Sequence, residues 1–296
     1  MRQAFLAMDS KTGPSGRATR WTDVCGNREC RTGWLQLFRS RDSPRFEEKW
    51  ACSSICMEQI VTGAVRSQIE SWEPVSGGRA LRMPLGLILL SRGWISHREL
   101  QEALAAQRRA QNGRIGEWLR RLHGVPEETI TKALGIQWNC AVLPSGMQGL
   151  ELTRSLIPAF LRKRYGLALL RQGPDRTLYL AGKYRAEYAA ARAMEHMLRE
   201  PVHAAFLEDS VWNSANADAT DTTEVHLPGR DGVVACIAEW MERSRPTDGR
   251  LVRVHDHLWL RIWLRGGARH PMRTLDIVLP LRGPDTKTGA ELIRSC

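Results

Sequence analysis

The stretch PLGLILLSRGWISHRELQEALAAQ, from Pro84 to Gln107, is followed six residues later by RIGEWLRRLHGVPEETITKALGIQ, from Arg114 to Gln137. We call these 24-residue stretches the first block and the second block. At an offset of 30 residues they share apolar positions, a glycine and a final glutamine. The matched pairs are Leu85 and Ile115, Gly86 and Gly116, Leu89 and Leu119, Leu100 and Ile130, Leu104 and Leu134, and Gln107 and Gln137. The sequence therefore predicts one small structure that is built twice.

Each block is predicted to form a short helix, a turn and a longer helix. In the first block Gly93 stands where a left-handed helix end belongs, and Ser96 with Glu99 forms a capping box for the next helix. In the second block Gly124 ends the short helix and Pro126 begins the longer one. The inner faces of the longer helices follow helical spacing and consist of Leu100, Ala103, Leu104 and Gln107, and of Ile130, Ala133, Leu134 and Gln137.

Helix packing explains the leucines of the blocks but explains their glycines and glutamines less well. A glycine inside a helix costs about 0.5–1 kcal/mol relative to alanine. Gly86 and Gly116 therefore indicate places where something flat or bulky approaches the backbone. A glutamine offers both a donor and an acceptor, and Arg114 offers a planar fork for a phosphate or a guanine edge. Two similar half-sites indicate a ligand with two similar halves.

With these features the chain resembles the N-terminal domain of type II secretion and type IV pilus ATPases, the GspE/PilB/MshE N-terminal domain. The family pattern is R-L-G-x2-L-x3-G-x6-L-x3-L-x2-Q, written twice. This chain departs from it at Pro84, where the family has Arg, and at His123, where the family has Gly. The resemblance continues through Ile157-Pro158 and Arg164-Tyr165 into the strands GLALLR and TLYLAG, and it covers about residues 80 to 212.

The resemblance implies a ligand, because several members of this family bind cyclic di-GMP with one guanine half in each block. The ligand-binding residues carried over to this chain are Leu85, Gly86, Leu89, Leu100, Leu104, Gln107, Arg114, Ile115, Gly116, Leu119, Leu134 and Gln137. Pro84 removes one charge-assisted contact, worth about 1.5–3 kcal/mol. Cyclic dinucleotide binding and a degenerate domain kept for protein contacts therefore both stay open. The resemblance also implies a protein partner in a secretion or pilus machine.

Four of the seven cysteines form a metal-site pattern. Cys25 and Cys30 are separated by four residues, Cys52 and Cys56 by three, and 21 residues lie between the two pairs. Two close pairs at this distance suit tetrahedral zinc. We expect a treble-clef-like zinc unit over residues 20–73, with a short strand in TGWLQLFRS and the second pair in the first turn of a helix. With four protein ligands the zinc would be structural; four unrelated buried thiols are the alternative. The other cysteines, Cys140, Cys236 and Cys296, are interpreted as isolated thiols.

The segment RLVRVHDHLWLRIWLRGG, which begins at Arg250, alternates strictly between apolar and polar residues and predicts a strand. Its outward face would consist of Arg253, His255, His257, Trp259, Arg261, Trp263 and Arg265. Such a face could stack on single-stranded nucleic acid or dock a protein. A second core layer, with the Trp rings covered by another domain, is the third interpretation. The pair His255 and His257 is interpreted as part of a solvated strand face.

The whole chain is predicted to be a multi-domain α+β protein. We expect a disordered tail (1–19), the zinc unit (20–73), a tandem helical repeat with a small αβ subdomain (80–212), a linker (213–228), a helix with antiparallel strands (229–283) and a tail (284–296). No apolar window long enough to span a membrane and no secretory signal is seen, so a cytoplasmic location without membrane insertion is expected.

The chain has 43 basic and 32 acidic residues and a net charge of +11. This surplus favours acidic partners such as nucleic acid or nucleotides, although the arginines are scattered. No G-x4-G-K-[ST], HExxH, GxSxG or GxGxxG motif occurs. We therefore expect a non-enzymatic regulatory or adaptor protein that senses a cyclic dinucleotide. A zinc-dependent nucleic-acid-binding regulator and an enzyme with an unfamiliar site are the alternatives.

Overall fold

The computed structural model describes residues 24–32, 44–71, 82–143, 151–153, 156–173, 175–182, 185–208, 212, 232–265 and 273–281. Within these ranges helices and three sheets form an α+β fold, so the predicted fold class is confirmed. The predicted tails, the linker 213–228 and the strand expected in TGWLQLFRS lie outside the described residues.

The two blocks form four helices: α2 (Leu85–Ser91), α3 (His97–Ala110), α4 (Ile115–His123) and α5 (Glu127–Trp138). The predicted helix ends are confirmed. Ser96 and Glu99 form the capping box at α3, and Gly93 and Gly124 adopt left-handed conformations with φ of 68° and 64°. The helices enclose their own apolar core. The blocks are interleaved, because α3 lies against α4 and α2 lies against α5.

A five-stranded mixed sheet follows the repeat. Its strands, in spatial order, are β3 (Ala141–Leu143), β7 (Val202–Leu207), β6 (Thr177–Gly182), β5 (Leu167–Gln172) and β4 (Glu151–Leu152). The helices of this region are α6 (Ala159–Tyr165) and α7 (Tyr188–Leu198). Strands β6 and β7 are parallel and α7 is the crossover between them. The strands expected in GLALLR and TLYLAG are found here as β5 and β6.

The C-terminal part consists of α9 (Gly232–Ser244) and an antiparallel sheet of β8 (Asp248–Val254), β9 (His257–Leu264) and β10 (Arg273–Pro280), in the order β10-β9-β8. The single strand predicted from Arg250 onward is wrong. His255 and Asp256 form a turn, with His255 at φ 56°, and the turn divides the segment into β8 and β9.

The N-terminal part consists of a hairpin, β1 (Arg45–Phe46) and β2 (Lys49–Trp50), and the helix α1 (Ser54–Glu70). This part and the C-terminal part are predicted to be separate units. In the structure they share one hydrophobic core, in which Phe46, Trp50 and Met57 pack with Ile237, Leu258 and others from α9 and the sheet. A three-stranded sheet and single helices cannot each bury their apolar faces alone, so the two segments complete each other.

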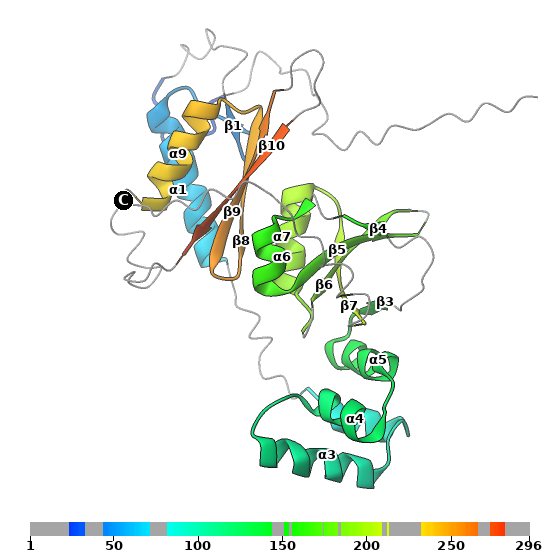
Figure 1. Ribbon diagram of the computed structural model, residues 1–296. Coiled ribbons are helices and arrows are strands. Elements are labelled where there is room, and N and C mark those ends of the chain that lie inside the picture. The colour runs from blue at the N-terminus through cyan, green and yellow to red at the C-terminus, as the bar shows by residue number, and fades with distance from the viewer. Residues whose placement is uncertain are drawn as a thin grey trace, which may run out of the picture.

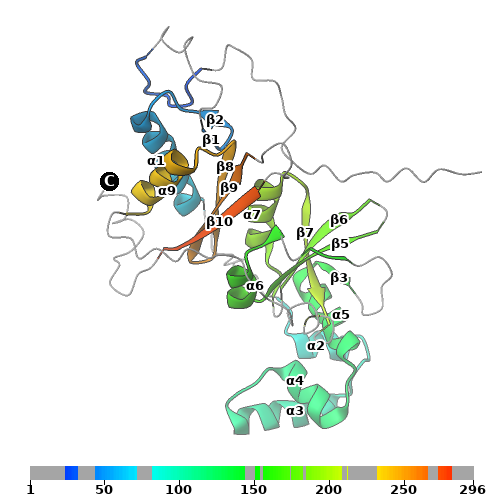
Figure 2. The ribbon, with the colours of Figure 1, turned by 45° about the horizontal axis from the view of Figure 1, so that its top comes forward.

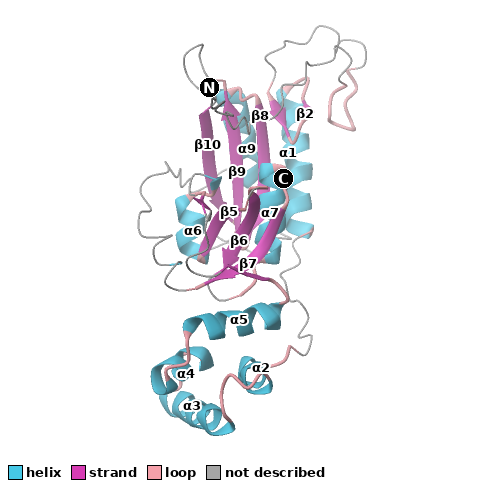
Figure 3. Cartoon of the chain, turned by 90° about the vertical axis from the view of Figure 1, so that its right-hand side faces the viewer, coloured by secondary structure: helices cyan, strands magenta, loops and turns pink. Residues whose placement is uncertain are grey.

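Three views show how these parts are layered. The helices α1 and α9 lie side by side on one face of the sheet β8–β10 (Figures 1 and 2). The other face of that sheet packs, through residues such as Val252 and Trp259, on α7 and the five-stranded sheet. The helical repeat lies at the far end of the molecule, below the larger sheet in Figure 3. No described helix is long and apolar enough to cross a membrane.

Candidate functional site

The four predicted cysteine ligands converge in the structure. The Sγ atoms of Cys25, Cys30, Cys52 and Cys56 all lie within 4.8 Å of one another. The Sγ of Cys52 is 3.5 Å from that of Cys30 and 3.5 Å from that of Cys56. Four sulfurs around a tetrahedral zinc at 2.3 Å would be about 3.8 Å apart. The cysteines therefore form a group that could bind one metal ion with four protein ligands.

The local structure around the cysteines explains how the sequence positions them. The backbone N–H of Gly26 donates to the Trp50 carbonyl at 2.7 Å, which fixes the Cys25 loop on β2. A Cβ at Gly26 would lie 2.5 Å from the Cβ of Lys49, so only glycine fits there. Ser53 is the N-cap of α1 and its side chain accepts a hydrogen bond from the Cys56 N–H. Cys56 therefore lies in the first helical turn, as predicted, where the helix dipole stabilises a thiolate. The prediction is wrong for Cys52, which precedes the N-cap of α1.

Polar neighbours complete the surroundings of the sulfurs. Asn27 Nδ2 donates to Cys56 Sγ at 3.3 Å, and the Thr32 hydroxyl lies 2.7 Å from Cys30 Sγ and 3.1 Å from Cys52 Sγ. The hydrogen bond from Thr32 lowers the pKa of the Cys30 thiol to about 6, whereas burial raises the pKa of Cys25 to about 12. Such outer-shell donors orient and stabilise metal-bound thiolates.

Matched positions of the two blocks have similar solvent exposure. Leu89 and Leu119 are fully buried, and Leu100 and Ile130 are also buried, so these four predicted ligand residues belong to the helical core. Partly exposed positions also occur in matched pairs, namely Leu85 and Ile115, Leu104 and Leu134, and Gln107 and Gln137. We call these six residues the twin patches.

The expectation that Gly86 and Gly116 leave open space for a ligand is wrong. Both glycines are buried. A Cβ at Gly86 would lie 2.6 Å from Leu100 Cδ1, and one at Gly116 would lie 2.9 Å from Ile130 Cγ2. Each glycine therefore lets the longer helix of its own block approach the shorter one. Close packing of the helices therefore explains why glycine stands at these two positions in spite of its low helix propensity.

The two glutamines form reciprocal hydrogen bonds between the blocks. Gln107 Nε2 of the first block donates to the carbonyl of Gly113, directly before Arg114 of the second block, at 2.9 Å. Gln137 Nε2 of the second block donates to the carbonyl of Met83, directly before Pro84 of the first, at 2.9 Å. Each glutamine thus fixes the start of the short helix in the other block, and the sequence alone did not indicate this exchange.

The start of the short helix differs between the blocks. Arg114 is the exposed N-cap residue of α4, and its backbone N–H donates to Glu117 Oε2 at 3.3 Å. Pro84 is the N-cap of α2 and offers no side-chain donor. The nearby Arg82 stacks its guanidinium over the Trp138 ring, 3.6 Å from the ring centroid. The first block therefore lacks the cation that the second block presents.

The exposed Arg/Trp face predicted on the C-terminal strands is wrong. Trp259 and Arg261 are buried, and the Trp ring lies in the core between the sheet and α7. Arg261 forms a two-pronged ion pair with Asp276 on β10, with N–O distances of 2.6 and 2.8 Å. Of the three interpretations of this segment, the covered core layer is the one that the structure confirms.

The histidine pair near this sheet is not a solvated strand face either. His255 Nε2 lies 3.0 Å from the buried carboxylate of Glu187, and buried His257 hydrogen-bonds through Nδ1 to the Tyr165 hydroxyl. The pair connects the β8–β9 turn to α6 and the start of α7. No sequence motif indicated these partners, because His255 and Glu187 are 68 positions apart along the chain and His257 and Tyr165 are 92 apart.

No family model and no curated protein matches the chain. Among solved structures, the chain is similar to one described as MshE with cdg. The two are 22% identical over 46% of this chain and 98% of that one, with a TM-score of 0.36.

Proposed function

We propose that this protein is a non-enzymatic regulator whose helical repeat binds a cyclic dinucleotide. The observation that carries this proposal is the pair of glutamines, Gln107 and Gln137, which take equivalent places in the two interleaved blocks. A duplicated surface suits a ligand with two equivalent halves. The ligand class comes from the sequence resemblance, and cyclic di-GMP is the member of that class to test.

The chemistry of the twin patches suits guanine. The amide nitrogen of each glutamine is engaged with a backbone carbonyl, which holds the side chain in place. The Oε1 atom of each glutamine accepts no hydrogen bond within the described residues, and guanine carries N–H donors on its Watson–Crick edge. Half-buried Leu85, Leu104 and their counterparts offer apolar surface for the base. Arg114, at the N-terminus of α4, offers charge to a phosphate.

The two halves of the proposed site are unequal, because the first block has Pro84 where the second block has Arg114. Only the second block presents an arginine at its N-cap, and Arg82 is engaged with Trp138. The loss of one charge-assisted contact is worth about one to two decades of affinity. We therefore expect the affinity to be about 10- to 100-fold weaker than that of a repeat with an arginine at both N-caps.

We propose that the metal ion held by the four cysteines is zinc and that its role is structural. Four sulfur ligands suit zinc, and they leave no coordination position for a substrate. Cys25, Cys30, Cys52 and Cys56 would hold the ion, and these four bonds would join the Cys25 loop and the segment after β2 to the start of α1. The nucleic-acid alternative loses part of its support, because Trp259 and Arg261 of the predicted Arg/Trp face are buried. A cytoplasmic location and a partner in a secretion or pilus machine remain parts of the proposal.

Titration calorimetry with cyclic di-GMP tests this function. We expect heat of binding for the wild type, at least tenfold weaker binding for Arg114→Ala, and loss of binding for Gln107→Leu. Gln101→Leu is the matched control, since Gln101 is an exposed glutamine on the same helix that bonds only His97 among the described residues. An absence of heat and of any melting shift at millimolar ligand would remove the sensor role.

A further inference from the structure

The two ends of helix α7 contact segments that adjoin the two candidate sites. It contains 11 residues, from Tyr188 to Leu198, and is therefore about 16 Å long. Its C-terminal turn meets the hairpin that leads into the cysteine cluster. Its first residue meets the end of α5, the last helix of the repeat. These two junctions are described in turn.

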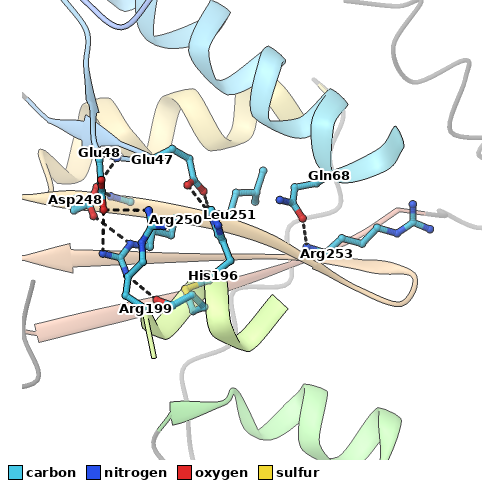
Figure 4. A network of polar contacts seen from close by, with 11 residues as sticks. Glu47, Glu48, Gln68, His196, Arg199, Asp248, Arg250, Leu251 and Arg253 are labelled. Atoms are coloured by element: carbon cyan, nitrogen blue, oxygen red, sulfur yellow. Dashed lines mark hydrogen bonds and ion pairs between the residues drawn. The ribbon is translucent and has the colours of Figure 1, made fainter. Parts of the chain in front are cut away.

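The C-terminal junction is a polar network around the turn Glu47–Glu48 (Figure 4). Glu47 Oε2 lies 2.7 Å from His196 Nε2 of α7, and Glu48 Oε1 lies 3.1 Å from Arg199 Nη2 at the helix end. Arg250 of β8 donates to the carbonyl of Met197 at 2.8 Å. Acidic groups of one short turn thus hold the end of α7 against the C-terminal sheet.

The same turn is bound to the edge of β8 on its other side. The Glu47 N–H donates to the Gly249 carbonyl at 2.7 Å, and Glu47 Oε1 accepts from the Leu251 N–H at 2.7 Å. Further along the edge, Gln68 of α1 accepts from the Arg253 N–H at 2.9 Å (Figure 4). These bonds come from the β1–β2 hairpin and from α1, which precede and follow Cys52 in the chain.

A metal ion at the cysteine cluster would therefore restrict the conformation of the Glu47–Glu48 turn. Glu47 and Glu48 have φ of 51° and 61°, a conformation that costs non-glycine residues about 1–3 kcal/mol and persists only where the surroundings impose it. The turn is followed by β2 and, two residues after Trp50, by Cys52. Since Cys52 and Cys56 would be fixed by the metal, so would the hairpin and the start of α1.

The N-terminal junction reaches the repeat. The Tyr188 hydroxyl donates to the carbonyl of Trp138 and lies 3.0 Å from that of Asn139, both at the C-terminus of α5. Trp138 directly follows Gln137, whose amide holds the Met83 carbonyl. The Trp138 ring also carries the stacked Arg82. Tyr188 thus supports the end of the helix that provides one of the twin patches.

We propose that α7 couples the metal site to the ligand site, so that metal loading raises the affinity of the repeat for its ligand. Metal binding fixes the Glu47–Glu48 turn, the turn fixes the end of α7, and Tyr188 then holds α5 in the position that supports Gln137. The ligand part of this inference rests on the proposed function. By linkage, ligand would also tighten metal binding by the same factor.

Hydrogen exchange followed by mass spectrometry tests the connection without ligand. The full chain is compared after zinc loading and after treatment with a chelator. We expect faster exchange after chelation at 251–253 and also, by about fivefold or more, at 136–140, a segment at least 80 positions along the chain from any cysteine of the cluster. Unchanged exchange at 136–140 beside faster exchange at 44–71 would overturn the proposal.

Tyr188→Phe separates coupling from general unfolding, because it removes one hydroxyl and leaves the ring. In this variant, chelation is expected to change exchange at 251–253 and no longer at 136–140. Tyr179→Phe, on the neighbouring strand β6, is the control and should behave as wild type. An equal metal response at 136–140 in Tyr188→Phe and wild type would also overturn the proposal.

Calorimetry with cyclic di-GMP tests whether the metal changes the affinity of the repeat for its ligand. We expect about fivefold or more weaker binding after chelation in the wild type, and metal-independent binding in Tyr188→Phe. Equal affinity with and without zinc in the wild type would overturn the coupling. Absence of heat with zinc-loaded protein would overturn the proposed function, and exchange at 136–140 would then still decide whether α7 connects the two sites.

Discussion

Arg261 and Asp276 form a fully covered, two-pronged ion pair across β9 and β10, and Trp259 Nε1 donates to the same carboxylate at 2.9 Å. All three side chains are buried. Asp276 is therefore the shared acceptor of a cation and an indole in the layer between the sheet and α7. The pair has consequences for stability, because neither charge could be hydrated if its partner were lost.

We expect Asp276→Ala to lower the free energy of unfolding by about 3–5 kcal/mol, since it leaves a buried guanidinium without its counter-charge. Chemical denaturation measures this change. The control is Glu239→Ala, which removes the exposed i,i+4 pair between Glu239 and Arg243 and should cost less than about 1 kcal/mol. Equal effects of the two variants would contradict the assignment of a buried pair.

The repeat glycines are expected to resist substitution. Gly86→Ala and Gly116→Ala each place a methyl group within 3 Å of Leu100 or Ile130, and such overpacking costs about 1–3 kcal/mol. Gly63→Ala in α1 is the matched control, because nothing lies within 4 Å of the added carbon. That control should gain about 0.5–1 kcal/mol from helix propensity. Thermal melts of the three variants test the close-packing explanation of the two glycines.

Glu187 is expected to make the junction between α7 and the β8–β9 turn sensitive to acid. Burial alone would raise the pKa of its carboxyl group, but hydrogen bonds from His255 and Arg185 outweigh burial and lower the pKa below the ordinary 4.5. A carboxylate with a lowered pKa stabilises the fold above its unfolded pKa and loses this contribution as pH falls through the folded value.

The test compares the free energies of unfolding of the wild type and Glu187→Gln between about pH 5.5 and pH 3. The wild type should be more stable at the upper end of this range, and the difference should shrink as the pH falls. A difference that stays constant would show that the charge of Glu187 does not contribute.

The cysteine cluster is expected to bind one zinc ion per chain. Metal analysis should find this stoichiometry in wild type and in Cys236→Ala, whose thiol lies in α9 outside the cluster, and should find none in Cys52→Ala. At free zinc about 1,000-fold above its Kd, binding should stabilise the fold by about 4 kcal/mol. Zinc-free wild type with intact cysteines that melts at the same temperature would contradict the site.

The features predicted correctly from the sequence are those that depend on neighbouring residues. The helix ends at Ser96 and Gly124 follow from caps within one turn, and the cysteine cluster follows from ligand spacing. The repeat itself is visible because both copies must bury the same positions. These signals are local, so no knowledge of distant partners is needed to interpret them.

The features that were missed depend on turns without the usual residues. Glu47–Glu48 and His255–Asp256 close tight hairpins without the Gly or Asn that ordinarily marks them. Missing the second turn inverted the faces of β9. In the structure Val252 lies opposite Trp259, and Leu251 lies opposite Leu260. Residues opposite each other in an antiparallel pair lie on the same face of the sheet. The continuous alternation had placed Trp259 on the side opposite Val252.

Distant partners could not be predicted either. Glu47 and His196 are separated by 149 positions, and the core shared by α1 and α9 joins segments from the two ends of the chain. Neither contact has a pattern within its own segment. The glutamines were identified as site residues, but their exchange between blocks appears only when α3 lies against α4.

Glu47 and Gln68 also act as a substitute for a fourth strand along β8. Their side-chain oxygens occupy the N–H groups of Leu251 and Arg253, the groups that another chain would use to extend the sheet. Removal of the metal would expose these N–H groups at the edge of β8, so metal-depleted protein should self-associate before it unfolds. The cysteine unit would then protect the molecule from aggregation as well as complete its core.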